Sequence, residues 1–439
     1  MHAVSRVAHC GSILHFRSDP GRHDEPDAYE YWERGVLIVT EGRIEAVGPA
    51  EALLHASGPD LQRIDHGQRL IMPGFIDTHI HYAQTDVIGA GGSNLLEWLE
   101  RHTFPAELRF ADPDYAAAVA EFFLDELMRQ GTTTAQVLAS VHKISAEAFF
   151  KAAAARGLRM IAGKTLMDRH CPPGLRDTAL DGEREMRELI ETWHGRGRLA
   201  YAITPRFAPT SSIAQLQSAG RLSREYPDVF IHSHLAENRA EVNWVRELFP
   251  DSRSYLDVYD RYGLLRERST YAHCIYLDVA DRRRLAQSGA GAAFAPSSNL
   301  YLGSGLFDLD ASDAAGMRYA LASDVGGGSS FSMLRTMGEG YKVAHLLGQR
   351  LTPLRAFYLA TLAGAQMLGL AHQIGRFEPG SEADFIVLDP EATPLLARRM
   401  AQTRNLSERL LLFMILGDER AVAATFILGR RAQPAPVAP

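Results

Sequence analysis

The chain has 439 residues, 46% of them hydrophobic and 23% charged, a composition typical of a globular protein with a large core. Its 46 basic and 53 acidic residues give a formal charge of −7, and without a long basic run this argues against nucleic-acid binding. No apolar run of about 18 residues predicts a membrane helix, and the polar start is unlike a secretory signal. The three cysteines, Cys10, Cys171 and Cys274, are far apart, which favours a reduced, cytoplasmic protein.

Both ends of the chain are predicted to be rich in β-structure. Residues 36–50 alternate apolar and polar side chains around Glu41-Gly42, the pattern of a β-hairpin. Residues 383–389 and 422–431 also have the composition of strands. Because chain ends often lie close together, we expect the two ends to pair into one small β-sandwich. The last segment, 432–439 (AQPAPVAP), has the low complexity typical of disorder.

The middle of the chain alternates between predicted strands and helices. The predicted strands cover residues 74–81, 132–139, 158–167, 198–206, 228–234, 269–276, 289–296 and 318–324. A long amphipathic helix over 115–130 ends at Gly131, and Ser145 is predicted to cap a helix over 146–157. This alternation predicts an α/β fold: a (β/α)8 TIM-like barrel over 69–376, with the small β-sandwich formed by 1–68 and 377–439.

The strongest chemical signal is the segment 73–81 (PGFIDTHIH). Alternate side chains of a strand share one face, so His79 and His81 would both point into the barrel near the carboxyl end of the strand. Two neighbouring imidazoles can form half of a zinc site. An isolated His-x-His pair is more often one buried histidine and one loop histidine, so the interpretation depends on later strands.

Later strands supply further candidate ligands at the edge where barrel active sites lie. Of His232 and His234, the second is the better candidate ligand, because Glu237 three residues later could act on a metal-bound water as a general base. Glu237 could equally be an acid favoured by a helix N-terminus, and the two roles are compatible. His273 alone would more often be a core histidine. Asp324 precedes three glycines, which allow close approach of the backbone to a ligand.

These segments resemble the amidohydrolase superfamily, whose members pair a metal-binding barrel with a small β-sandwich built from both chain ends. The resemblance covers about residues 35–430, and it is carried by PGFIDTHIH, HSHLAE (232–237), AHC (272–274), LASD (321–324) and GRFEPGSEADFIVLD (375–389). It implies one Zn²⁺ per subunit, held by His79, His81, His234 and Asp324; such a ligand set also suits Fe²⁺. It further implies Glu237, Asp324 and His273 as catalytic residues, with Glu237 as the proton shuttle, and a homodimer.

Within the superfamily, the chain is most similar to the guanine deaminase family. The similar segments are HYAQTDVIGA (81–90), LLEWLERHTFPAE (95–107), IAGKTLMDRHCP (161–172), YAITPRFAPTS (201–211), SSNLYLGSGLF (297–307) and SDVGGGSSFSMLRTM (323–337). The resemblance implies hydrolysis of guanine to xanthine and ammonia in purine catabolism, by attack of a zinc-activated hydroxide at C2. The implied substrate contacts are His81, Gln84, Arg206, Phe207, Glu237 and Asp324.

Several alternatives stay open at this point. Arg206 suits a carbonyl oxygen and Phe207 can stack on a flat base, but they could instead be a strand-end ion pair and a core aromatic. Related zinc barrels deaminate cytosine, adenine nucleosides, 8-oxoguanine or triazines, and others open cyclic amides. A non-catalytic barrel that has lost its metal is disfavoured, because every expected ligand and the shuttle carboxylate are present.

Overall fold

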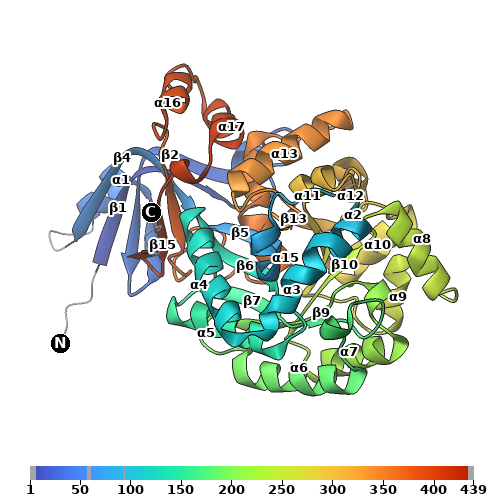
Figure 1. The fold of residues 1–439 in the computed structure, drawn as a ribbon. Coiled ribbons are helices and arrows are strands. Elements are labelled where there is room, and N and C mark those ends of the chain that lie inside the picture. Colours follow the sequence, from blue (N-terminus) through green and yellow to red (C-terminus); the bar gives the residue numbers. More distant parts are fainter. Residues whose placement is uncertain (1–5, 57–60, 93, 434–439) are drawn as a thin grey trace.

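The computed structural model describes residues 6–56, 61–92 and 94–433, so residues 434–439 of the predicted low-complexity tail lie outside it. The chain forms a barrel of parallel strands surrounded by helices, with a separate mixed sheet beside it (Figure 1). This arrangement confirms the predicted fold class, a (β/α)8 barrel with a small β-domain from both chain ends. Within the described residues, no helix is both long and apolar enough to cross a membrane. The domain boundaries stay predictions.

The barrel strands follow one another in the order β5-β6-β7-β9-β10-β11-β12-β13. Their bounds are β5 (Phe75–His81), β6 (Thr132–Leu138), β7 (Arg159–Gly163), β9 (Ala200–Pro205), β10 (Phe230–Leu235), β11 (Ser269–His273), β12 (Gly291–Phe294) and β13 (Arg318–Leu321). A short strand, β8 (Thr165–Leu166), continues β7 and pairs with β9. Between the first and last strands, Asp324 N donates to His79 O at 3.0 Å and His81 N to Val325 O at 2.8 Å. These bonds bring the two ends of the strand series together at the carboxyl edge.

Helices connect the barrel strands and cover their outer side. They are α4 (Pro113–Arg129), α5 (Lys143–Ala155), α6 (Ala179–Trp193), α7 (Ile213–Glu225), α8 (Arg239–Leu248), α9 (Tyr255–Arg261), α10 (Val279–Ser288), α11 (Pro296–Tyr301), α12 (Leu309–Ala314), α13 (Met333–Leu346), α14 (Pro353–Leu359) and α15 (Leu362–Met367). The predicted helix before Gly131 is α4, which Asp112 caps by accepting two backbone N–H bonds. The predicted cap at Ser145 is wrong: α5 begins two residues earlier, and the Ser145 hydroxyl donates back to His142 O at 2.7 Å.

The second sheet has seven strands in the order β16-β15-β14-β4-β1-β2-β3. Their bounds are β1 (Arg6–Phe16), β2 (Tyr29–Thr40), β3 (Arg43–Pro49), β4 (Gln62–Pro73), β14 (Phe385–Leu388), β15 (Val422–Ile427) and β16 (Arg430–Arg431). The predicted hairpin is β2–β3, and β14 from the end of the chain pairs with β4 from its beginning. Figure 1 shows the red-orange strand β15 beside the blue strands of the N-terminal part. The helix α1 (Ala50–Ala56) packs on β2 and β3. The helices α16 (Pro394–Met400) and α17 (Leu406–Leu416) pack on each other, and α17 also contacts α13 and α14 of the barrel.

The chain passes from the sheet into the barrel at Gly74, between β4 and β5. A Cβ atom there would lie 2.2 Å from the hydroxyl oxygen of Thr133, so only glycine fits against β6. Gly74 N also donates to Asp384 O at 3.1 Å, next to β14. The Pro-Gly pair before the first histidine motif therefore joins the two parts of the molecule and sets where β5 begins.

Candidate active site

Four side chains meet at the carboxyl ends of three barrel strands. His79 and His81 come from β5, His234 from β10, and Asp324 follows β13. His81 Nε2 lies 3.2 Å from His79 Nε2 and 3.1 Å from His234 Nε2, and His79 Nε2 lies 3.0 Å from Asp324 Oδ1. The four ligand atoms lie within 4.8 Å of one another. The structure thus brings together the four predicted ligands.

The outer nitrogens of two of these histidines are fixed by neighbours. His234 Nδ1 lies 2.6 Å from the Arg206 carbonyl oxygen. Because this oxygen can only accept, the proton of the neutral imidazole is on Nδ1, and Nε2 is left with a free lone pair. His79 Nδ1 lies 2.7 Å from His232 Nε2. Asp77 accepts bonds from Ser323 N and Ser323 Oγ and so ties β5 to the end of β13. Such outer contacts are how proteins orient metal ligands.

The ligand set fits a divalent metal ion. Nitrogen and oxygen atoms bound at about 2.0 Å around a tetrahedral zinc lie about 3.3 Å apart, close to the separations found here. Burial lowers the pKa of His79 to about 4, although Asp324 opposes it, and the pKa of His234 also lies well below its usual value because of burial. Imidazole nitrogens whose lone pairs face one another at such distances repel unless a proton or a metal cation lies between them. The separations and the donor atoms of this cluster therefore fit the predicted metal site.

Glu237 lies beside this cluster, just before α8, and is 3% exposed. Its Oε1 accepts a bond from Ser304 Oγ at 2.7 Å, and its Oε2 lies 3.4 Å from His273 Nε2. Burial raises the pKa of Glu237, and the nearby Asp324 carboxylate raises it further against the opposing effect of His273. A raised pKa makes a carboxylate a stronger base, so this buried group beside the cluster can accept a proton and pass it on.

His273 lies beside Glu237 and Asp324 at the edge of the ligand cluster. Its Nδ1 lies 2.9 Å from Asn299 Oδ1, and its Nε2 lies 3.7 Å from Asp324 Oδ2. Burial lowers the pKa of His273, but the Glu237 and Asp324 carboxylates outweigh burial, so the net shift is upward. The backbone at His273 and Asp324 is left-handed, with φ of 72° and 50°. Such conformations cost free energy for non-glycine residues and cluster at functional sites.

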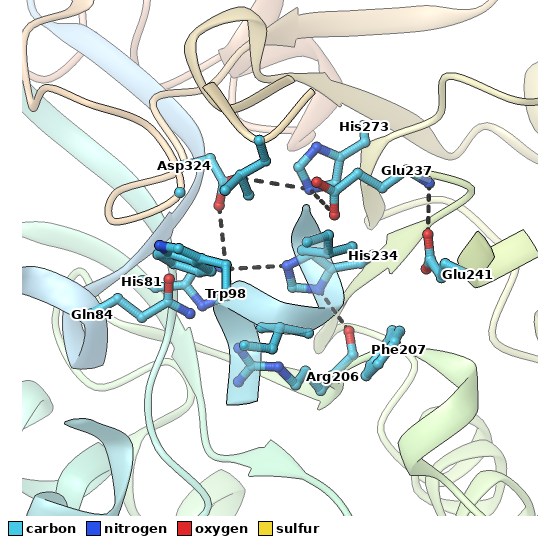
Figure 2. A pocket seen from close by; sticks show the side chains of 14 residues that line it. His81, Gln84, Trp98, Arg206, Phe207, His234, Glu237, Glu241, His273 and Asp324 are labelled. Atoms are coloured by element: carbon cyan, nitrogen blue, oxygen red, sulfur yellow. Dashed lines mark hydrogen bonds and ion pairs between the residues drawn. The ribbon is translucent and has the colours of Figure 1, made fainter. Parts of the chain in front are cut away.

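A pocket opens over these groups. Figure 2 shows three of the four ligand side chains, His81, His234 and Asp324, lining the pocket, with Arg206 and Phe207 below them. Its apolar wall comes from Leu95, Trp98, Leu99, Phe207 and Leu302. Three of these lie on α2 (Leu95–Trp98) and on the π-helical turn η3 (Leu99–Thr103). Together with α3 (Phe104–Leu108) these elements form what we call the cover segment, which lies between β5 and α4 in the chain. The indole of Trp98 is held by a bond to Ala90 O at 2.9 Å.

The predicted substrate contacts all line this pocket: His81, Gln84, Arg206, Phe207, Glu237 and Asp324. Arg206 is 2% exposed and pairs with Glu107, so it is an ion pair and a pocket residue at once. Phe207 likewise packs in an apolar cluster while facing the pocket. Sequence reasoning did not single out Glu107, Trp98, Ser304 or Glu241, although the first two lie in the segment 95–107 that carried the family resemblance.

Comparisons with known proteins agree with this geometry. The sequence pattern of the amidohydrolase family matches residues 70–432. The chain belongs to the amidohydrolase family. It is 48% identical over 404 residues to the guanine deaminase of Escherichia coli (strain K12), covering 92% of each chain.

Solved structures give the same result. The E. coli guanine deaminase structure superimposes with a TM-score of 0.95 at 45% identity, covering 98% of this chain and 100% of that one. The guanine deaminase of C. acetobutylicum, solved with guanine bound in its active site, superimposes with a TM-score of 0.88 at 27% identity, covering 97% and 99%. The similarity extends over the barrel and the sheet together, so the prediction of superfamily membership is confirmed.

Proposed function

We propose that the protein is a zinc-dependent guanine deaminase, which converts guanine and water into xanthine and ammonia. The observation that carries this proposal is the cluster of His79, His81, His234 and Asp324, three of which line one pocket together with Glu237 and Arg206. Its support from outside the chain is the name shared by relatives that match it over nearly their full length.

The four clustered side chains would hold the metal ion. Zn²⁺ suits three imidazoles and one carboxylate, and histidine-rich sites also accept Fe²⁺. When bound, the ion would supply a water molecule whose pKa is lowered toward about 7 and would make it a nucleophile at neutral pH.

The protein's own groups would move the protons. Glu237, held by Ser304, would take a proton from the attacking water and deliver it to a ring nitrogen of guanine, which makes C2 more electrophilic. Asp324 Oδ2 and His273 Nε2 face the same space and would hydrogen-bond to the oxygen that adds to C2. The second proton of that water, now on the hydroxyl added to C2, would pass by way of the Asp324 carboxylate to the amino group. The C2–N bond then breaks, ammonia leaves and the C2 carbonyl of xanthine forms, while the ring nitrogen keeps the first proton.

The pocket side chains outside the ligand cluster would bind the base. Arg206 offers N–H groups for a carbonyl oxygen, and Gln84 offers both a donor and an acceptor. The flat apolar faces of Trp98 and Phe207 suit a planar heterocycle. A cytoplasmic location stays a prediction from the few, scattered cysteines, and a homodimer stays a prediction from the family resemblance.

The first test is the Glu237→Gln variant. It should keep its metal, because Glu237 is outside the ligand cluster, and lose about 10²- to 10⁴-fold in kcat, because the proton shuttle is removed. Ultraviolet conversion of guanine to xanthine, ammonia release and metal content are measured together. Glu247→Gln, an exposed residue of α8, is the matched control. Near-normal turnover by the metal-loaded Glu237→Gln protein would rule out the shuttle role, and no turnover by the wild-type protein would contradict guanine as substrate.

A further inference from the structure

A carboxylate outside the metal cluster connects two of the pocket's polar walls. Glu107 lies on α3 and is 1% exposed. Its two oxygens accept bonds from Arg206 Nη1 at 2.7 and 2.9 Å, and Oε1 also accepts from Gln84 Nε2 at 3.2 Å. The Ser140 hydroxyl donates to the backbone oxygen of Glu107 at 3.0 Å and so holds the main chain at this residue. One buried acid therefore contacts two side chains that line the pocket from different barrel loops.

These contacts fix the orientation of the Gln84 amide. The Glu107 carboxylate can only accept, so it selects the NH₂ end, while Gly326 N–H donates to Gln84 Oε1 at 3.3 Å and selects the oxygen end. One amide hydrogen and one lone pair are left for a ligand in the pocket. Without the carboxylate, only the Gly326 N–H would select the orientation of the amide.

Glu107 also neutralises Arg206. A guanidinium that is 2% exposed is costly unless a carboxylate pairs with it, and Glu107 is the carboxylate whose oxygens bond to it. Arg206 Nη1 is occupied by this pair, whereas among the described residues no acceptor bonds to its Nε or Nη2. The wall thus offers N–H donors without net positive charge, which suits the carbonyl of an uncharged base better than an anion.

We propose that Glu107 is a positioning residue that sets the ligand selectivity of the pocket. Its hydrogen bonds hold Arg206 and Gln84 in place, and its charge cancels that of Arg206, so that the wall binds an uncharged oxopurine rather than an anionic one. This inference rests on the proposed function. It extends that function to the charge state of the ligand: the substrate guanine is uncharged near neutral pH, whereas the more acidic product, xanthine, ionises more readily.

The test is the Glu107→Gln variant, which keeps the shape and an acceptor oxygen but leaves Arg206 charged. The KM for guanine should rise about tenfold or more, with a smaller change in kcat, because the two hydrogen bonds that hold the Arg206 guanidinium against residue 107 are weakened. At the same time, the inhibition constant for xanthine at mildly alkaline pH, where part of it is anionic, should fall. A purely structural role would not move KM and this inhibition constant in opposite directions. Glu100→Gln, exposed on the same cover segment, is the matched control.

A second variant keeps the test decisive if Glu107→Gln does not fold. Glu107→Asp retains the charge but shortens the reach to Arg206 and Gln84, so KM for guanine should rise while the inhibition constant for xanthine does not fall. A wild-type KM and inhibition constant in the variants that fold would overturn the role of Glu107 and leave the proposed function intact. Absent guanine turnover in the wild-type protein would instead contradict the proposed function itself.

Discussion

A single histidine behind the metal cluster shows what sequence spacing can and cannot reveal. The spacing of β10 predicts that His232 and His234 share a face, and the carboxylate at position 237 favours His234, which is the one that lies in the cluster. Spacing does not say how deep His232 lies in the barrel. The structure places it one layer below, fully buried, with its Nε2 2.7 Å from His79 Nδ1.

The position of His232 leads to a prediction about metal affinity. When His79 binds metal through Nε2, its Nδ1 carries the proton and needs an acceptor, which His232 Nε2 provides. His232→Ala should therefore weaken Zn²⁺ binding by about 10- to 100-fold, and His232→Gln, which restores an oxygen acceptor, should recover part of it. Competition with a metal-binding dye measures this, with His345→Ala, an exposed histidine of α13, as control. Unchanged affinity in His232→Ala would show that His79 needs no such partner.

At the scale of elements, regular patterns were predictable and the cover of the pocket was not. The barrel strands were placed by their short apolar runs and intervening helices, and the structure confirms them within a few residues. The segment from α2 to α3 changes helix type at η3, so no single period describes it. Its apolar side chains face the pocket rather than the barrel. Their direction depends on where the rest of the fold places that pocket, which the local sequence does not show.

The start of α8 carries a second carboxyl group whose ionisation should affect stability. Glu241 forms a capping box with Asn238, accepts bonds from Glu237 N and Tyr255 Oη, and is 1% exposed. Burial raises the pKa of Glu241 to about 7 from 4.5; the Glu237 carboxylate adds to this, while the Tyr255 bond and His273 oppose it. Between those two pH values the folded protein holds a proton that the unfolded chain has lost.

The sign of the effect follows from this difference. Because the folded state binds more protons over this window, the contribution of Glu241 to stability falls as pH rises from about 4.5 to 7 and is constant above. Glu241→Gln mimics the protonated group and should exceed the wild type in stability at pH 8, by up to about 3 kcal/mol, with the advantage vanishing near pH 4.5. Urea unfolding of both proteins across this range measures it. Parallel stability curves for the two would contradict the prediction.

At the scale of the whole molecule, pairing of the two chain ends was predictable, but the contacts that join them to the barrel were not. Arg159 at the start of β7 and Arg198 before β9 both bond to Glu382, which precedes β14. Arg198 also pairs with Asp384, whose side chain is 2% exposed. These partners are at least 184 residues apart, and charged residues alone do not indicate which opposite charge they will meet.

Removing one member of this buried network should therefore destabilise the molecule without altering the chemistry. Arg198→Met leaves Glu382 and Asp384 with one cation fewer between barrel and sheet, which should lower the free energy of unfolding by about 3–5 kcal/mol. The kcat of the folded variant at 25 °C should stay at the wild-type value, because Arg198 precedes β9 whereas the pocket lies at the carboxyl ends of the strands. Arg196→Met, an exposed arginine beside Trp193, is the control, and urea unfolding with parallel activity assays gives both quantities. Equal unfolding midpoints for Arg198→Met and the wild type would mean that the apolar contacts of the sheet, rather than this ion network, hold the two parts together.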